Sequence, residues 1–252
     1  MTADPDPVTQ SRTTTGGAVP ARDEAARASR GRSAKLLPPT DPIGTLARPE
    51  LETRLLDGTE RRLTIVVGGA GFGKSTLAAR VAAVRPTAWY TLDASDRHIG
   101  ALASGITAAL RLRLPGIPDD ASDAVESSIE ATDDAAIVAQ ASASAALVTD
   151  ALQAALDGDL VLVLDDLHVL SGAAGSLRFV EALVRLAPAG LHVLVTSRAE
   201  VPFAIERLRG QGQVLDLGGT ALAFSADEIH ELLHALLGDD RDHADLHDVA
   251  AE

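Results

Sequence analysis

Apolar side chains along the chain follow two patterns, short continuous runs and longer segments with helical spacing, and the two patterns alternate. The runs at 160–164 and 191–195 are aliphatic almost throughout. Continuous rather than alternating hydrophobicity is typical of a strand that is buried on both faces of a parallel sheet. The strands predicted in this way span residues 63–67, 87–92, 160–164, 191–195 and 214–217.

Helical spacing of apolar residues fills the segments between these strands. The helices predicted from it span residues 49–56, 73–83, 99–112, 143–156 and 176–186. Residues 114–142 are rich in aspartate and alanine and poorly periodic, so we expect a loop there, with room for some helix. Because strands alternate with helices, the predicted fold class is α/β, a three-layer sandwich whose mainly parallel sheet is joined by right-handed crossovers.

The two ends of the chain differ from this central part. Residues 1–40 are rich in Thr, Ser, Gly, Pro and Arg without apolar periodicity, so we expect a disordered tail there. A new helix is predicted after Ser225, whose hydroxyl would cap it together with Glu228 three residues later. The predicted division is a tail at 1–40, the α/β domain at 41–222 and the beginning of a further subdomain at 223–252.

A glycine-rich loop follows the first predicted strand and matches the pattern G-x-x-x-x-G-K-[ST]. Glycines let successive backbone N–H groups turn toward phosphate oxygens, and a helix that starts near Gly73 adds the positive end of its dipole. Lys74 would reach the β- and γ-phosphates, and the Ser75 hydroxyl would bind Mg²⁺. The sequence therefore predicts the P-loop of a nucleotide-binding protein. The residues expected around the phosphates are Gly68, Gly69, Ala70, Gly71, Phe72, Gly73, Lys74, Ser75 and Thr76.

Two more of the predicted strands end in polar groups that suit ATP. The strand at 160–164 leads into Asp165 and Asp166, and the strand at 191–195 leads into a polar run that ends in Arg198. Ligands of open parallel sheets bind beyond the carboxyl ends of the strands. We therefore expect these side chains to converge on the P-loop.

Each of these side chains has a predicted role. Asp165 is the expected Walker B carboxylate, which holds Mg²⁺ through its water shell. Asp166 would polarise an attacking water, and the alternative for it is the cap of a following helix. Because aspartate is shorter than the glutamate common at that position, hydrolysis would be slow. Arg198 would sense the γ-phosphate, and the alternative for it is a surface ion pair.

Charge and composition disfavour several classes of function. The net charge is −14 and aromatic residues make up 2% of the chain, so direct binding of DNA by this stretch is not expected. No run approaches the roughly 18 consecutive apolar residues of a membrane span. Cysteine is absent, which fits the cytoplasm. No lysine follows Lys74 and asparagine is absent, so the guanine-reading element of many GTPases is missing and the expected ligands are ATP or ADP with Mg²⁺.

A competing motif lies near the C-terminal end. His230, Glu231 and His234 complete H-E-x-x-H, in which two histidines bind Zn²⁺ and the glutamate activates water in a zinc peptidase. A third ligand would have to come from His243 or His247, and His243 is out of step with the longer zinc-binding pattern. An apolar stripe on the same helix places both motif histidines on the opposite, solvated face, so the peptidase is the weaker alternative. The stripe consists of Ile229, Leu232, Leu233, Leu236 and Leu237.

The order of the motifs resembles that of STAND ATPases, and in particular the N-terminal NTPase domain of large LuxR-type and maltose-activator-like bacterial transcriptional regulators. The resemblance covers about residues 36–237. It is carried by the P-loop and by Leu36-Leu37-Pro38-Pro39, Arg48-Pro49-Glu50, Ala88-Trp89-Tyr90-Thr91-Leu92-Asp93, Val163-Leu164-Asp165-Asp166-Leu167-His168, Val195-Thr196-Ser197-Arg198 and Leu222-Ala223-Phe224-Ser225.

The resemblance implies a slow nucleotide switch in an AAA-like fold. ADP would hold a closed monomer, and inducer with ATP would open it to self-associate, so that activation rather than turnover is the output. Arg48 and Glu50 would lie near the nucleotide base, Arg198 would be the first sensor, and the chain from Ser225 would begin a helical or winged subdomain that closes over the nucleotide. A general AAA-type ATPase with ordinary turnover and a module that only retains ADP are the alternatives.

The sequence also departs from the family pattern. Family members are usually much longer, with a repeat-containing sensor region and a C-terminal helix-turn-helix through which DNA would be bound. Neither is present here, so the chain is expected to be truncated relative to them. The Arg48-Pro49-Glu50 element lacks the Gly-Arg pair that is typical of STAND proteins.

Overall fold

The computed structural model describes residues 33–40, 46–118 and 133–237 of the 252-residue chain. Contacts divide the chain into two units, Met1–Ala34 and Lys35–Glu252, and the second unit contains all strands of the described residues. This unit begins at Lys35, earlier than the boundary at residue 40 that composition suggested. Most of the predicted tail, residues 1–32, and the C-terminal residues 238–252 lie outside the described residues.

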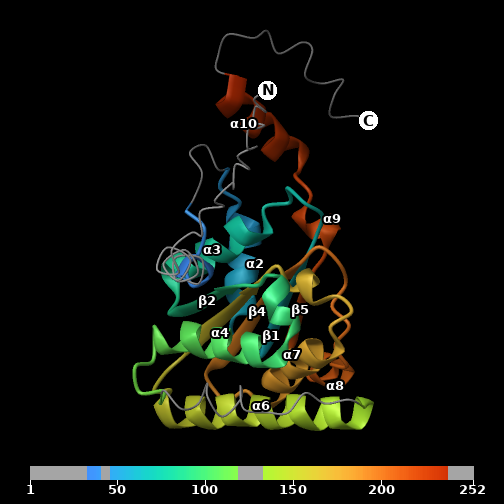
Figure 1. Ribbon diagram of the computed structural model, residues 1–252. Coiled ribbons are helices and arrows are strands. Elements are labelled where there is room, and N and C mark those ends of the chain that lie inside the picture. Colours follow the sequence, from blue (N-terminus) through green and yellow to red (C-terminus); the bar gives the residue numbers. More distant parts are fainter. Residues whose placement is uncertain (1–32, 41–45, 119–132, 238–252) are drawn as a thin grey trace, which may run out of the picture. The chain divides into compact units, whose positions relative to one another are not determined.

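A five-stranded sheet forms the centre of the second unit, in the order β2-β3-β4-β1-β5 (Figure 1). Every neighbouring pair of strands is parallel. The predicted α/β class with a parallel sheet is therefore confirmed, and each predicted strand is present with small shifts at its ends. The strands are β1 (Leu63–Val67), β2 (Thr87–Thr91), β3 (Leu160–Asp165), β4 (Leu191–Ser197) and β5 (Val214–Leu217).

Helices connect the strands, and the last of them follows the sheet. The predicted cap at its start is confirmed: the Ser225 N–H donates to Glu228 Oε2 (2.8 Å) and the Glu228 N–H donates to Ser225 Oγ (3.2 Å). The helices are α2 (Pro49–Gly58), α3 (Lys74–Val84), α4 (Ile99–Arg111), α6 (Asp134–Ala155), α7 (Ala174–Leu186), α8 (Glu206–Gly210), α9 (Gly219–Leu222) and α10 (Ala226–Leu237), with the short 3₁₀ turns η1 (Ala94–Arg97) and η2 (Leu167–Leu170).

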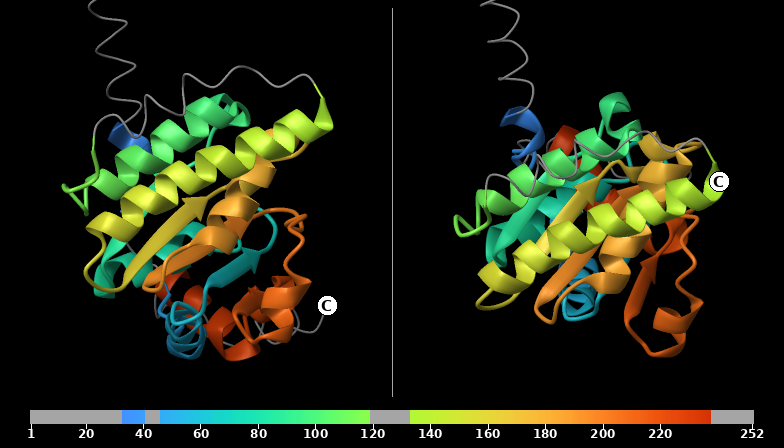
Figure 2. Two further views of the ribbon diagram at one scale, coloured as in Figure 1. Left: turned by 90° about the horizontal axis from the view of Figure 1, so that it is seen from below. Right: turned by 60° about the horizontal axis from the view of Figure 1, so that its bottom comes forward.

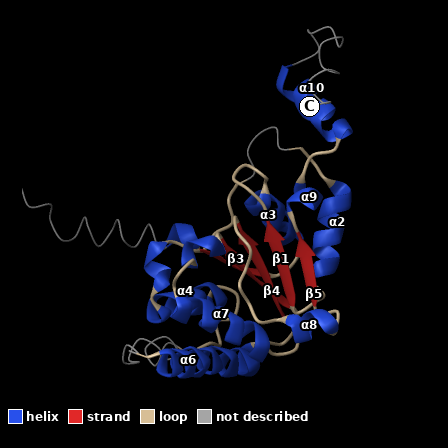
Figure 3. Ribbon diagram, turned by 90° about the vertical axis from the view of Figure 1, so that its right-hand side faces the viewer, coloured by secondary structure: helices blue, strands red, loops and turns tan. Residues whose placement is uncertain are grey.

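Both faces of the sheet are buried, as the continuous aliphatic strands require. Along β3, Leu162 and Leu164 pack into the core shared with α4, α6 and α7, whereas Val161 and Val163 pack toward α2 and α3. Figure 2 looks onto the face covered by α4, α6 and α7, and in Figure 3 α2 lies on the other side of the sheet. The side chains of one strand thus alternate between two apolar layers, which gives the predicted three-layer arrangement.

The helix α6 begins at Asp134, well before the predicted start at residue 143. Asp133 caps it by accepting the Ala136 N–H (2.7 Å), and its many alanines favour helix while giving a weak hydrophobic period. By length and average composition α6 would also be long and apolar enough to cross a membrane, although polar residues interrupt its apolar runs. It packs on α7 through buried residues at helical spacing, as a core helix of a globular domain does. These residues are Ala141, Ser144, Ala145, Val148, Thr149 and Leu152.

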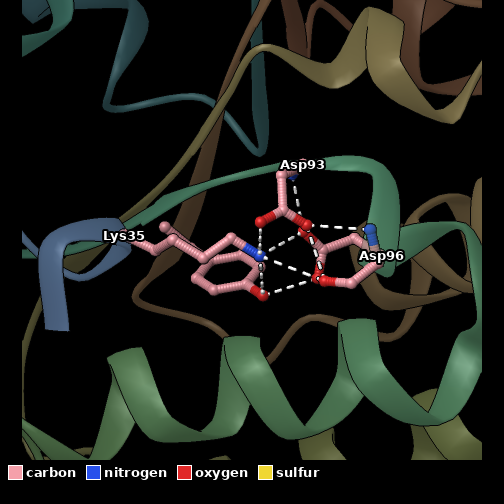
Figure 4. A network of polar contacts seen from close by, with 5 residues as sticks. Lys35, Asp93 and Asp96 are labelled. Carbon is pink, nitrogen blue, oxygen red and sulfur yellow. Dashed lines mark hydrogen bonds and ion pairs between the residues drawn. The ribbon is translucent and has the colours of Figure 1, made fainter. Parts of the chain in front are cut away.

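Lys35 ties the start of the second unit to the turn that follows β2 (Figure 4). Its ammonium lies 2.8 Å from Asp96 Oδ2, 3.0 Å from Asp93 Oδ2 and 3.2 Å from the Tyr90 hydroxyl. The Tyr90 hydroxyl in turn donates to the fully buried Asp96 (2.6 Å). Burial and this carboxylate raise the pKa of Tyr90 above its ordinary value. Lys35 therefore supplies the positive charge that a buried carboxylate needs.

Candidate functional site

The carboxyl ends of β1, β3 and β4 lie side by side at one edge of the sheet. β1 and β4 pair as far as Val67 and Ser197, and the Gly68 N–H donates to the Ser197 carbonyl (3.1 Å). β3, the other neighbour of β4, ends at Asp165. The predicted convergence of the glycine-rich loop, Asp165 and Arg198 on one edge is therefore observed.

The glycine-rich loop (residues 68–76) turns through two glycines in the left-handed region, Gly71 (φ 82°) and Gly73 (φ 70°). A side chain would be strained at either position, because L-residues rarely adopt such angles. Gly73 is also the N-cap of α3 and has no side chain that could cap the helix. Backbone N–H groups at the start of a helix lack partners within the helix, so this end of α3 offers donors and a positive dipole to an anion.

Lys74 follows this turn, and only 6% of its surface is exposed. Its ammonium donates to the Gly69 carbonyl (2.7 Å) within the same loop. Burial lowers the pKa of Lys74 below its ordinary value; Asp166 and Asp165 oppose this effect, whereas Arg198 adds to it. The four charged side chains are thus close enough to influence one another.

Asp165 is buried at the centre of this edge, with 4% of its surface exposed. Its Oδ1 accepts hydrogen bonds from the Ser75 hydroxyl (2.8 Å) and the Thr196 hydroxyl (2.5 Å). Burial raises the pKa of Asp165, although these two hydrogen bonds and the Lys74 ammonium oppose that shift. Ser75 and Asp165, the two predicted metal ligands, therefore touch directly across the sheet edge.

Asp166 adopts the left-handed conformation (φ 64°), the single non-glycine residue with positive φ among the described residues. Its backbone N–H donates to the Thr196 hydroxyl (3.0 Å). Its side chain makes no capping hydrogen bond to η2, so the structure does not support the alternative that Asp166 caps the following helix. The nearest ionisable partner is His168, whose Nδ1 lies 3.5 Å from Asp166 Oδ1.

Arg198, the first residue after β4, is exposed. No ion pair to an acidic side chain is recorded for it within the described residues, so the alternative of a surface ion pair finds no support there. Its guanidinium is near enough to Lys74 to help lower the pKa of the Lys74 ammonium.

Arg48 lies on a separate apolar pocket of about 180 Å³ beside the glycine-rich loop. Its guanidinium is engaged by the end of α9 and the first turn of α10: it donates to the carbonyls of Leu222 (2.7 Å) and Ala223 (2.8 Å) and to the carboxylate of Glu228 (2.8 Å). Glu50 is exposed and does not line this pocket. Residues that line it from α2, the glycine-rich loop, α3, the segment before α10 and α10 itself include Leu51, Phe72, Thr76, Leu77, Phe224 and Leu232.

The competing H-E-x-x-H motif lies on α10. His230 and His234 are exposed, their ring centroids 6.5 Å apart, whereas Ile229, Leu232 and Leu233 are half-buried, as the apolar stripe predicted. Within the described part of the chain, no three His, Asp or Glu side chains cluster as a metal site would require. His243 and His247 lie outside the described residues.

Two side chains have contacts at the site that the sequence did not predict. Thr196 bridges Asp165 and the Asp166 backbone through one hydroxyl, and its position directly after a buried strand was the available signal. Glu228 was assigned only to the helix cap, yet it also pairs with Arg48. The two residues are 180 positions apart, so no local pattern connects them.

Comparison with known proteins identifies the family of this chain. Residues 45–196 match the AAA ATPase domain, and the chain belongs to that family of α/β P-loop ATPases. A search of solved structures finds a Walker-type ATPase of Pyrococcus abyssi at a TM-score of 0.48 and 14% identity, covering 85% of this chain and 65% of that one.

Within that class, the chain is homologous to a named group of regulators. It is 32% identical over 206 residues to the HTH-type transcriptional regulator MalT of Yersinia enterocolitica, and 31% identical to MalT of Yersinia pestis. The match covers 81% of this chain but only 22% of each relative, so the chain spans about a fifth of their length.

Proposed function

We propose that this chain is the Mg²⁺-dependent, ATP-binding switch of a MalT-type transcriptional regulator of the STAND class, with hydrolysis that is slow and regulatory. The observation that carries the proposal is the 2.8 Å contact between Ser75 Oγ and Asp165 Oδ1. Hydroxyl and carboxylate oxygens are ligands that Mg²⁺ prefers, and here they come from two different elements that meet beside Lys74. A structural hydrogen bond alone would not account for the buried ammonium next to it.

The residues at this edge fit a nucleotide triphosphate. The loop from Gly68 to Thr76 offers backbone N–H groups to phosphate oxygens. Lys74 offers a buried cation, and a phosphate oxygen could replace the Gly69 carbonyl as the acceptor of its hydrogen bond. Ser75 would bind Mg²⁺ directly and Asp165 through water. When bound, the metal would neutralise the phosphate charge that the chain's own cations do not reach.

Two side chains would couple the γ-phosphate to the rest of the domain. Arg198 is exposed at the end of β4 and would pair with the γ-phosphate, so that its loss releases the guanidinium. Asp166 would orient the attacking water. Its short side chain and the left-handed backbone that fixes its direction both favour slow turnover.

The apolar pocket beside the loop suits the base. Its volume of about 180 Å³ is smaller than the roughly 300–1,000 Å³ of pockets that enclose a whole drug-sized ligand, so it suits one part of a ligand, such as a nucleobase. In this proposal Arg48 builds the wall of that pocket instead of contacting the base, because its donors are already engaged. Adenine is favoured over guanine on the sequence grounds given above.

The properties of the longer protein are part of the same proposal. The resemblance to STAND regulators implies that ATP would promote self-association and that the protein would act in the cytoplasm. The HTH-type MalT relatives support binding of DNA only through a C-terminal helix-turn-helix. The second candidate is an AAA ATPase with ordinary turnover, which the family match by itself would equally allow.

Titration of the purified chain with ATP, ADP and GTP, each with and without Mg²⁺, tests the proposal. We expect ATP and ADP to bind, Mg²⁺ to strengthen ATP binding, GTP to bind more weakly, and turnover to stay well below about 1 s⁻¹, the lower end of typical enzymes. No binding of any nucleotide would refute the proposal. Brisk turnover would favour the ordinary ATPase, ADP retained without turnover would favour a degenerate module, and stoichiometric zinc would revive the peptidase.

A further inference from the structure

Arg48 joins the start of α2 to the end of α9. Its two Nη atoms donate to the carbonyls of Leu222 (2.7 Å) and Ala223 (2.8 Å). The last carbonyls of a helix have no partner within the helix, so a guanidinium placed there satisfies them. Arg48 thereby fixes the point at which the chain leaves the sheet domain for α10.

The same guanidinium forms a two-point pair with Glu228 in the first turn of α10. Arg48 Nε lies 2.8 Å from Oε1 and Nη2 lies 3.1 Å from Oε2, the fork geometry in which arginine binds carboxylates best. The two side chains are shielded from solvent, 12% and 24% exposed respectively. The Arg48 hydrogen bond also lowers the pKa of Glu228 below its ordinary value, so the pair is charged at neutral pH.

The pair lies against the candidate base pocket. The Arg48 guanidinium carbon is 4.7 Å from the centre of the Phe224 ring, and both residues line the pocket together with Leu232 of α10. Thr76 and Leu77 of α3 line the same pocket. One wall of the pocket therefore consists of the segment that the Arg48–Glu228 pair holds in place.

Other contacts of α10 with the sheet domain are sparse. In the described part of the chain, α10 shares no extensive backbone proximity with any helix or strand, and its apolar residues Ile229, Leu232 and Leu233 are only half-buried. The Arg48–Glu228 pair is therefore an important contact between α10 and the sheet domain among the described residues.

We propose that the Arg48–Glu228 pair is a latch that closes the base pocket, with Glu228 as a positioning residue that holds Phe224 and Leu232 over the nucleotide. The inference rests on the proposed nucleotide site. With the latch formed, bound ADP is enclosed and leaves slowly. When the pair breaks, α10 and Phe224 move away together and the nucleotide is exposed to exchange.

The rate at which a fluorescent ADP analogue leaves the protein tests the latch. Glu228→Gln removes the charge but keeps an oxygen that accepts the Ser225 N–H, so the cap of α10 survives while the fork to Arg48 is lost. Arg48→Gln breaks the pair from the other side. Glu231→Gln is the matched control, because Glu231 is on the same helix, carries the same charge and is exposed.

We expect Glu228→Gln and Arg48→Gln each to speed ADP release roughly five- to tenfold, which corresponds to about 1.0–1.4 kcal/mol. The double variant should be no faster than the faster single variant, because the two changes break one interaction. Glu231→Gln should release ADP at the unaltered rate, and amide exchange within 226–237 should increase in the two latch variants alone.

Two results would overturn the latch while leaving the nucleotide site intact. One is an ADP release rate that is the same in all variants although the unaltered chain binds ADP. The other is an equal acceleration by Glu231→Gln, which would show a general effect of charge on α10. If the unaltered chain binds no nucleotide, the proposed function fails and the latch fails with it.

Discussion

Replacing Asp165 with asparagine should stabilise the protein without ligand and abolish its response to magnesium. Asp165 is 4% exposed, and its carboxylate accepts two hydroxyl hydrogen bonds but has no ion pair at contact distance in the described residues. Asparagine keeps an oxygen that can accept from Ser75 and Thr196 and removes a buried charge. From the cost of burying an incompletely compensated charge, we expect a gain of about 1–2 kcal/mol in the free energy of unfolding.

The pH dependence of stability independently predicts that Asp165→Asn increases the free energy of unfolding. Burial raises the pKa of Asp165 in the folded protein above its unfolded value. Such a group favours folding below its unfolded pKa, and this contribution is lost as the pH rises through the folded pKa. At neutral pH the natural residue therefore lacks that contribution, so the advantage of Asp165→Asn should be largest there and should shrink on acidification.

Thermal unfolding of both proteins, with and without Mg²⁺-ATP, measures these effects. A gain of 1 kcal/mol raises the melting temperature by about 2–4 °C for a domain of this size. Ligand at one hundred times its Kd would add about 2.7 kcal/mol to the natural protein, and we expect little additional effect of Mg²⁺ on the variant. Asp157→Asn, at an exposed position before β3, is the control and should change neither property. A destabilised Asp165→Asn protein that still responds fully to Mg²⁺ would refute the reasoning.

Further substitutions test other parts of the account. Lys74→Ala should abolish ATP binding by removing the phosphate-facing cation, and an undiminished titration curve would contradict that role. Thr196→Val should slow hydrolysis more than it weakens binding, because it frees the Asp166 backbone, and Thr196→Ser should restore the rate; equal loss in both variants would argue against the hydroxyl bridge. Lys35→Met should cost about 3 kcal/mol by leaving the buried Asp96 without its cation, and a second change, Asp96→Asn, should recover part of that loss in urea unfolding. His230→Ala should leave stability and nucleotide binding within about 0.5 kcal/mol of the unaltered values, and a large loss reversed by zinc would revive the peptidase.

Much of the fold was predictable because it depends on local pattern. An uninterrupted aliphatic strand such as β3 indicates burial on both faces of the sheet. The cap formed by Ser225 and Glu228 is also a local pattern, because it lies within four residues. The start of α6 was not predicted, because its alanines carry little hydrophobic contrast although they pack well. The contacts of Lys35 were not predicted either, because they join it to residues about 60 positions away.

The candidate site also has one part that the sequence predicts and one part that it does not. The glycine-rich loop and the acidic pair each directly follow a predicted strand, so their placement at one edge followed from the rule that the carboxyl ends of parallel strands share an edge. The hydrogen bond from Thr196 to Asp165 depends on the direction in which one hydroxyl points. The ion pair of Arg48 depends on Glu228, which is 180 residues away in the sequence. Neither fact leaves a periodic or local trace in the sequence. These contacts of Arg48 are the reason for proposing that it builds the pocket wall.

A crystal structure of the chain with Mg²⁺ and a slowly hydrolysed ATP analogue tests the central claim most directly. We expect the Lys74 ammonium to exchange the Gly69 carbonyl for phosphate oxygens, the metal to bind the Ser75 hydroxyl with Asp165 in its water shell, and Arg198 to face the γ-phosphate. A nucleotide bound elsewhere, or a metal at this edge that contacts neither Ser75 nor the water shell of Asp165, would contradict the account.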